Sequence, residues 1–219
     1  MNFTEQALKK PRALLLLGIC FLAVVVVLGF FLKNSLISAE DTDVLGDFVV
    51  RRSDNATSFF TFVSSIFDPL GTIILSMLAA GIFWLVTRNW RYPGFIFGSV
   101  VASAAFTYAL KFAFHRSRPP LLDHLVDETD FSFPSGHVTG TSALLFSLAV
   151  VLTLRASSRS VRILTWLAAA LLVAAVAASR LYLGVHWFTD TAAGALVGTG
   201  TVAIMSAILF SQTKQIPAS

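Results

Sequence analysis

Residues 13–32 read ALLLLGICFLAVVVVLGFFL, twenty residues without one charged side chain. A helix of this length rises about 30 Å, the thickness of the hydrocarbon core of a bilayer. The run lacks the alternation of apolar and polar residues that a membrane strand would show. It therefore predicts a helix that crosses the membrane. Its length favours an uncleaved anchor over a signal peptide, whose apolar core is shorter.

Five further uncharged runs of similar character follow along the chain. They cover residues 69–87, 92–110, 138–154, 163–179 and 191–213. The fourth and fifth of the six runs are about 17 residues long, at the lower limit for a span. Gly, Ala and Ser are frequent in the third, fifth and sixth runs, as in closely packed membrane helices. The sequence predicts an all-α, six-helix membrane bundle in which residues 1–219 form a single domain.

The composition argues against a cytosolic enzyme, a nucleic-acid-binding protein and a disulfide-rich scaffold. Only 13% of the 219 residues are charged, against about 25% in soluble proteins, while 56% are hydrophobic. The net charge of +4 is too small and too scattered to indicate nucleic acid binding. The single cysteine, Cys20, lies within the first apolar run and can form no intrachain disulfide. Nothing in the sequence indicates an obligate protein partner, and the expected surroundings are the lipid bilayer.

The basic residues predict the orientation of the bundle. In a six-span topology most of them fall on one side, namely Lys9, Lys10, Arg12, Arg88, Arg91, Arg155, Arg159, Arg162 and Lys214. The positive-inside rule makes this side cytoplasmic. Ten of the twelve acids lie in the two large loops on the other side. We expect a multi-pass plasma membrane protein with both termini in the cytoplasm and its polar loops outside.

The first of these outer loops, residues 33–68, carries apolar faces among polar residues. Aromatic and aliphatic side chains recur at helical spacing, including Phe48, Phe59, Phe60, Phe62 and Phe67. One interpretation is an amphipathic helix lying in the membrane interface near a lipid entrance. The alternative is a loop packed over the bundle. The sequence supports both equally.

Ionisable residues stand at three outer helix ends, where the positive-inside rule does not explain them. Such groups near lipid are costly and usually functional. The first cluster follows the third run, with Lys111 at its end and Arg118 seven residues later. A lysine supplies a point charge, whereas an arginine supplies a planar fork that suits phosphate oxygens. This cluster predicts an oxyanion site.

The second and third clusters add acid–base and nucleophilic chemistry. Ser135 and Gly136 precede the fourth run, where helix N–H groups bind anions, and His137 follows as a candidate proton donor. Before the sixth run, His186 and Asp190 are spaced by one helical turn. A carboxylate at that distance fixes the imidazole tautomer and leaves the other ring nitrogen free as a nucleophile or base.

Arg180 adds a third cation to the anion site. Two histidines and an aspartate could in principle bind zinc, but three neighbouring cations would repel a divalent metal. The residues therefore predict an oxyanion site with a nucleophilic histidine, a histidine acid and no metal.

The three clusters together resemble the signature of type 2 phosphatidic acid phosphatases, the PAP2 superfamily. Its parts stand here as Lys-x6-Arg-Pro from Lys111, Pro-Ser-Gly-His ending at His137, and Ser-Arg-x5-His-x3-Asp ending at Asp190. The motifs are complete and in order. They cover residues 111–190, and the six-span layout extends the resemblance over nearly the whole chain.

The resemblance implies a role for each position and needs no metal or other cofactor. His186 would attack phosphorus and form a phosphohistidine, with Asp190 orienting the ring. His137 would protonate the leaving oxygen and then help water to release phosphate. The phosphoryl oxygens would be held by Lys111, Arg118, Ser135, Gly136 and Arg180. His115 and Arg116 lie in the variable part of the first motif and receive no catalytic role, and His124 is expected to be a solvated loop residue.

The short chain resembles the bacterial branch, whose substrates are lipid phosphates. An outward-facing site favours polyprenyl (undecaprenyl or decaprenyl) diphosphate, because that carrier is dephosphorylated outside the cell. Phosphatidylglycerophosphate or phosphatidic acid is the alternative. From another class, a transporter or binder of anions or lipid phosphates would use the same charges without turnover. The charges gather on one side, with none at the midplane, which argues against transport.

Overall fold

Each of the six apolar runs lies within one helix of the computed structural model, which describes residues 10–33 and 38–213. These helices are α2 (Pro11–Lys33), α5 (Pro69–Thr87), α6 (Arg91–Phe114), α7 (Gly136–Arg155), α8 (Arg159–Tyr182) and α9 (Phe188–Thr213). Two shorter helices, α3 (Ser38–Val49) and α4 (Asp54–Ile66), and a 3₁₀ turn, η1 (Leu121–Asp123), complete the chain order. The described residues contain no strand, so the predicted all-α membrane fold is confirmed.

Several helices extend past the uncharged runs that predicted them. Helix α6 continues to Phe114 and so contains Lys111, while α7 begins at Gly136. The fourth and fifth spans, expected to be short, are helices of 20 and 24 residues. Each predicted run ended at a charged residue or a histidine. A helix continues beyond that point wherever such side chains find partners, as Arg180 does at the end of α8.

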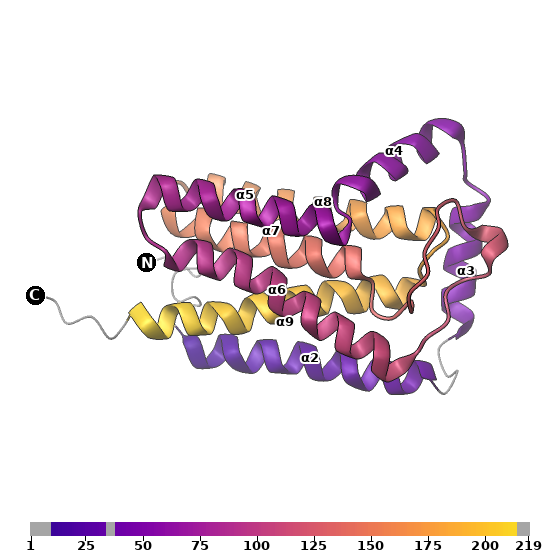
Figure 1. Cartoon of the computed structure of the whole chain (residues 1–219), viewed down its shortest axis with the longest axis horizontal. Helices are drawn as coiled ribbons and strands as arrows, with labels where there is room; N and C mark the ends of the chain where they lie inside the picture. The colour runs from indigo at the N-terminus through magenta and orange to yellow at the C-terminus, as the bar shows by residue number, and fades with distance from the viewer. Residues whose placement is uncertain (1–9, 34–37, 214–219) are drawn as a thin grey trace, which may run out of the picture.

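The six spans lie side by side, with α7 and α9 the most buried (Figure 1). Small residues bring these helices close together. A Cβ added to Gly198 of α9 would lie 2.5 Å from the Cβ of Ser142 on α7. A Cβ on Gly18 of α2 would lie 2.6 Å from the carbonyl oxygen of Gly200 on α9. The close approach of α9 to both neighbours therefore depends on glycine.

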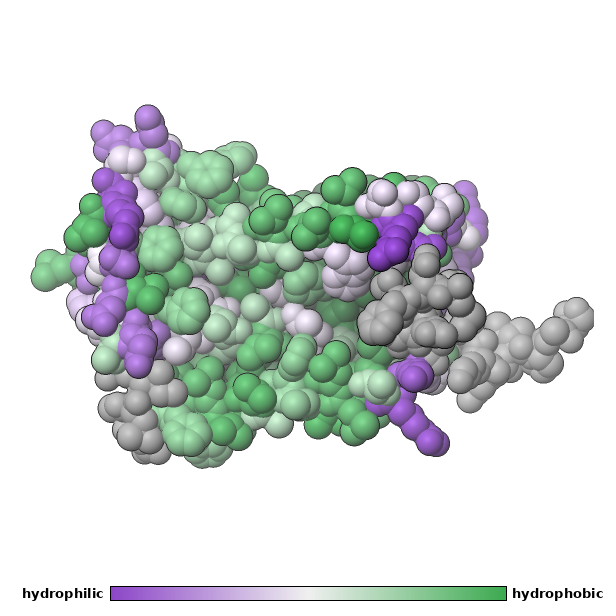
Figure 2. Space-filling view, turned by 180° about the vertical axis from the view of Figure 1, so that it is seen from behind, coloured by the Kyte–Doolittle hydropathy of each residue, from purple (hydrophilic) through white to green (hydrophobic). Residues whose placement is uncertain are grey.

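The surface divides into an apolar belt and two polar ends. Figure 2 shows hydrophobic side chains covering the middle of the bundle, with hydrophilic side chains gathered at both ends. All six long helices meet the length and hydropathy required to cross a bilayer. The chain is a multi-pass membrane protein.

The basic residues that predicted the orientation gather at one end of the bundle. They lie where α2 begins, at the turn between α5 and α6, and at the turn between α7 and α8 (Figure 1). Lys9 and Lys214 lie outside the described residues. The ends of α6 and α8 and the starts of α7 and α9 are all at the opposite end.

Residues 38–66 of the predicted outer loop form α3 and α4, which lie at that opposite end (Figure 1). Helix α4 packs against α8, where the ring of Phe60 lies 4.6 Å from the ring of Tyr182. Phe59 and Phe62 on its other face are 55% and 65% exposed. The segment is therefore helical and packed over the bundle on its inner face. Contact of its outer face with the membrane interface stays a prediction.

Candidate active site

The three sequence clusters meet at the end of the bundle where α3 and α4 lie. Because α6, α7, α8 and α9 alternate in direction, the end of one helix lies beside the start of the next. The backbone N–H of Ser135, before α7, donates to the carbonyl oxygen of Asp190, in α9, at 3.0 Å. This bond joins the second cluster to the third. All eight predicted site residues lie in this region, whereas their individual roles stay predictions.

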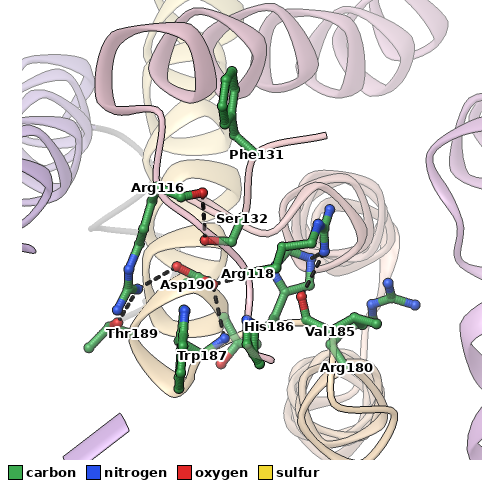
Figure 3. A network of polar contacts seen from close by, with 12 residues as sticks. Arg116, Arg118, Phe131, Ser132, Arg180, Val185, His186, Trp187, Thr189 and Asp190 are labelled. Atoms are coloured by element: carbon green, nitrogen blue, oxygen red, sulfur yellow. Dashed lines mark hydrogen bonds and ion pairs between the residues drawn. The ribbon is translucent and has the colours of Figure 1, made fainter. Parts of the chain in front are cut away.

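Helix α6 and the loop after it bring two cations to the site. Lys111, in the last turn of α6, is buried and forms an ion pair with Asp130 at 3.1 Å. Arg118 lies in the loop, and its Nη1 donates to the carbonyl oxygen of Val185 at 2.7 Å. Val185 belongs to the turn between α8 and α9, so Arg118 ties the first cluster to the third (Figure 3).

The start of α7 offers hydrogen-bond donors. Ser135 is the N-cap residue, and its buried Oγ has no hydrogen-bond partner among the described residues. Gly136 follows as the first helical residue, and the atom nearest to a Cβ added there is Pro69 Cγ at 3.8 Å. Free N–H groups and the positive end of the helix dipole favour an anion at this position. His137, in the same turn, is buried.

A tight turn places His186. Helix α8 ends at Tyr182, and Gly184 adopts a φ of 74°, in the left-handed region that glycine tolerates best. A Cβ on Gly184 would also lie 2.0 Å from the carbonyl oxygen of Asp123. Any other residue would therefore strain the turn and displace His186, which lies just before α9 rather than within it.

His186 and Asp190 form the predicted pair. The ring Nδ1 of His186 lies 3.4 Å from Oδ2 of Asp190, and both side chains are buried. On the other side of the ring, Nε2 lies 3.3 Å from Nη1 of Arg118. A guanidinium can only donate, so Nε2 must accept and Nδ1 must carry the proton toward Asp190. This is the tautomer that leaves a lone pair on Nε2.

The charge state of His186 agrees with that tautomer. Burial, followed by the charges of Arg118 and Arg180, lowers the pKa of His186 well below its ordinary value. The ring is therefore neutral at neutral pH, as a nucleophile must be.

Two acids of the loop before α7 pair with the cations. Arg180 is buried, and its guanidinium pairs with Glu128 and donates to Oγ of Ser64, while its Nε has no hydrogen-bond partner among the described residues. Arg118 pairs with both Glu128 and Asp130. Partial burial raises the pKa of Asp130, but the neighbouring Lys111 and Arg118 outweigh it and the pKa is lowered overall. The carboxylates of Glu128 and Asp130 therefore lie beside the cations, at positions where the sequence predicts the oxygens of a bound phosphate.

Comparison with known proteins defines the family. Residues 92–214, more than half of the chain, match the PAP2 superfamily. The chain belongs to the PAP2 superfamily. A relative, decaprenylphosphoryl-5-phosphoribose phosphatase of Mycobacterium tuberculosis, is 32% identical over 142 residues, which cover 64% of this chain and 72% of the relative.

Two solved structures share the fold. The transmembrane PAP2 type phosphatidylglycerolphosphate phosphatase of Bacillus subtilis has a TM-score of 0.68 at 21% identity, with 96% of this chain and 99% of that chain covered. LpxE of Aquifex aeolicus has a TM-score of 0.57 at 21% identity, with 78% and 94% covered. The six-span PAP2 bundle predicted from the sequence is confirmed.

Four residues of this PAP2 site were not predicted from the sequence, namely Asp41, Arg116, Glu128 and Asp130. Arg116 donates to Asp190 and to Asp41 of α3, both at 2.6 Å, and Glu128 pairs with two cations. The sequence held a signal for Asp41, because Asp41 stands one helical turn before the apolar Leu45. The structure shows that Leu45 is buried, so both side chains lie on the inner face of α3. No comparable pattern marks Glu128, because its partners come from separate elements.

The remaining histidines lie apart from this arrangement. His115 is exposed and ends α6, and no catalytic contact involves it. His124, expected to be solvated, is half-buried, and its Nε2 lies 3.0 Å from the carbonyl oxygen of Pro119. In the described ranges, no three His, Cys, Asp or Glu side chains form a group that could hold a metal ion. Metal-independent chemistry stays a prediction.

A cavity of about 230 Å³ opens from the site between α5, α6 and α7. At one end it is lined by Lys111, Asp130 and Gly136. Its other walls are mostly apolar or small and include Ile73, Val100, Ala104 and the exposed Tyr108. The cavity therefore leads from the cations toward the apolar belt.

Proposed function

We propose that this PAP2 protein is a metal-independent lipid phosphatase that works through a phosphohistidine on His186. One observation carries the proposal. The lone pair on Nε2 of neutral His186 faces Arg118, in a region where Oγ of Ser135 and Nε of Arg180 are buried donors that have no hydrogen-bond partner within residues 10–33 and 38–213. Buried donors of this kind call for an acceptor. A phosphoryl group bound there contacts both the donors that hold its oxygens and the nucleophile, His186.

The chemistry follows from these positions. Nε2 of His186 attacks phosphorus, the bond from phosphorus to the leaving oxygen breaks, and His137, which enters the step as imidazolium, gives that oxygen a proton and becomes neutral. Asp190 holds the Nδ1 proton and stabilises the positive ring that forms. In the second step, water gives a proton to His137 and its oxygen attacks phosphorus. The phosphorus–nitrogen bond then breaks, and phosphate and the starting enzyme are recovered.

The cations supply the electrostatic stabilisation. Negative charge on the phosphoryl oxygens is met by Lys111, Arg118 and Arg180, and by the Gly136 N–H at the start of α7. Lys111 and Arg180 are buried and held by the fold, so little reorganisation of these two groups accompanies the reaction. The bound phosphoryl group would take the place of the carboxylates of Glu128 and Asp130.

The proposed substrate is a phosphate carried by a polyprenyl lipid, with polyprenyl diphosphate as the first candidate. The cavity supports a lipid, because it leads from the cations toward the apolar belt. The M. tuberculosis relative supports a prenyl chain, since its name specifies a decaprenylphosphoryl substrate. That name also favours a second candidate, a phosphomonoester on a prenyl-linked sugar. Phosphatidylglycerophosphate and phosphatidic acid are the remaining alternatives.

The proposal includes the placement of the site. The positive-inside rule puts the arginine-rich turns and both termini in the cytoplasm, and hence the site on the outer face of the plasma membrane. All of residues 1–219 are proposed to act as one domain.

Phosphate release from purified protein in detergent tests the proposal. Polyprenyl diphosphate, a prenyl-linked sugar phosphate, phosphatidylglycerophosphate and phosphatidic acid are compared, with EDTA in excess and with His186→Ala as control. We expect EDTA-resistant release that His186→Ala abolishes, fastest for a prenyl substrate. Release that survives His186→Ala contradicts the mechanism. No release from any lipid, combined with tight binding of phosphate, supports the transporter or binder.

A further inference from the structure

We propose that Arg116 and Asp41 act as a positioning pair that holds Asp190 in place against His186. The inference rests on the proposed function and adds Asp41, which lies outside the PAP2 motifs, and Arg116, which stands at a variable position of the first motif. Neither contacts the region proposed for the phosphoryl group. They act through Asp190, which in turn sets the tautomer of the nucleophile.

Arg116 connects two carboxylates that come from distant parts of the chain. Its Nη1 donates to Oδ1 of Asp190 and to Oγ1 of Thr189, at 2.6 and 2.7 Å (Figure 3). Its Nη2 donates to Oδ2 of Asp41 at 2.6 Å. The guanidinium also lies against the ring of Trp187, 5.7 Å from its centroid. Arg116 thus binds Oδ1 of Asp190, whereas Oδ2 is the oxygen that faces His186.

Asp41 fixes the far end of this bridge. Its Oδ1 accepts the backbone N–H of Thr189 at 2.9 Å, and its Oδ2 accepts both the Thr189 hydroxyl and Arg116. The residue is only 1% exposed. A buried carboxylate without hydrogen-bond partners would be very unfavourable. The three hydrogen bonds of Asp41 therefore indicate that the fold holds this side chain in place. Helix α3 therefore contributes directly to the support of the site.

The contacts leave Asp190 one orientation. Oδ1 accepts from Arg116, while Oδ2 accepts the backbone N–H of Trp187 at 2.9 Å and faces Nδ1 of His186. Without Arg116, Oδ1 would be a buried acceptor without its charged donor, and the carboxylate could rotate or take up a proton. Either change weakens its hold on the Nδ1 proton. The tautomer of His186 that has its lone pair on Nε2 would then no longer be favoured.

The charges of Asp41, Arg116 and Asp190 also support the positioning role. Asp41 and Asp190 are both buried, and two carboxylates so near each other need a cation between them. The guanidinium of Arg116 supplies one charge and places separate nitrogens on the two acids. A lysine has a single ammonium group and matches this geometry less well.

The test compares Arg116→Gln, Arg116→Lys and Asp41→Asn with a matched pair of controls. Arg51 and Asp47 form an ion pair within the same outer segment, at 3.1 Å, but both side chains are 68% exposed. Phosphate release from the best lipid substrate is followed for each variant. We expect Arg116→Gln to lower kcat by about tenfold or more while KM changes less than about twofold. Arg116→Lys should recover part of kcat, Asp41→Asn should act in the same direction, and Arg51→Gln and Asp47→Asn should match the wild type.

A spectroscopic measurement separates this inference from the proposed function. In ¹⁵N-histidine-labelled protein, with the signal of His186 assigned through His186→Gln, the ¹⁵N shifts report which ring nitrogen carries the proton. We expect Nδ1–H in the wild type and a shift toward Nε2–H in Arg116→Gln. The comparison needs no turnover, so it decides the inference even if no lipid is hydrolysed. Arg116→Lys and Asp41→Asn serve the same measurement if Arg116→Gln does not fold.

Two results would overturn the positioning role. An unchanged tautomer in Arg116→Gln, together with kcat within about twofold of the wild type, would show that Asp190 needs no support. A raised KM with unchanged kcat and tautomer would instead make Arg116 a ligand of the phosphoryl group.

Discussion

At the scale of single residues, the site depends on keeping one imidazole neutral in the middle of several cations. His186 is buried beside Arg118, and both burial and this charge disfavour imidazolium. The charge of Asp130 raises the pKa of His186 but does not outweigh them, and Asp190 contributes a contact of 3.4 Å to Nδ1. Under the proposed mechanism, the ring is therefore ready to attack at neutral pH and becomes positive only when phosphorus bonds to it, which is when Asp190 matters most.

The first prediction concerns pH. Because His186 must be neutral to attack, kcat/KM falls on the acid side where His186 becomes protonated, and the lowered pKa puts this fall well below pH 6.5. Arg118→Gln removes a cation that lowers this pKa. The acid limb should therefore move to higher pH, in addition to a loss of rate. Wild type and variant are compared on one substrate, so that ionisation of the substrate is common to both, and an acid limb that stays in place would contradict the assignment.

The second prediction concerns the carboxylates among the cations. Asp130 pairs with Lys111 and Arg118, yet its side chain is 55% exposed. Asp130→Asn should strengthen inhibition by vanadate by up to about fivefold, because a half-exposed ion pair is worth at most about 1 kcal/mol. Asp127→Asn is the control, since Asp127 is exposed and forms none of the ion pairs found among residues 38–213. Equal inhibition constants for the two variants would show that Asp130 does not compete with the anion.

At the scale of elements, the proposed site needs α7 and α9 close together, because α7 contributes the N-terminus that is proposed to bind the anion and α9 contributes Asp190. Gly198 makes this approach possible. A Cβ there would lie 2.5 Å from Ser142 Cβ and 2.7 Å from the carbonyl oxygen of Thr139. The small residues of the sixth span, read from the sequence as packing residues, have this physical use.

The third prediction tests that packing. Gly198→Ala should lower the melting temperature in detergent by about 2 to 12 °C, because overpacking costs about 1–3 kcal/mol. Gly81 of α5 is the matched control, since a Cβ added there meets nothing within 4 Å. Gly81→Ala should leave the melting temperature unchanged or raise it, as alanine favours helices. A similar effect of both substitutions would mean that the contact of α7 with α9 tolerates a methyl group.

At the scale of the whole molecule, every charged group of the site lies at one end of the bundle and the arginine-rich turns lie at the other (Figure 1). The apolar belt between them fixes how the molecule sits in the bilayer (Figure 2). In the proposed orientation, a lipid phosphate of the outer leaflet places its head group among the cations while its chain stays near the cavity between α5, α6 and α7.

The fourth prediction tests this orientation. Cys20, the only cysteine, is replaced by Ala, and a single cysteine is placed at an exposed position of either end. On intact cells, a membrane-impermeant maleimide should label Asp127→Cys but not Ser157→Cys. Ser157→Cys should react only after the cells are permeabilised. The reverse pattern would put the site in the cytoplasm.

The sequence by itself determined the class of fold, the number of spans and the eight motif residues. It could do so because hydrophobic length and motif spacing are local properties of the chain. It could not determine the Arg116–Asp41–Asp190 network or the pairing of Glu128 with Arg118 and Arg180. Those contacts join residues up to 148 positions apart, such as Asp41 and Thr189. Only the tertiary structure decides them, because partners of buried charges are chosen by which helix ends meet.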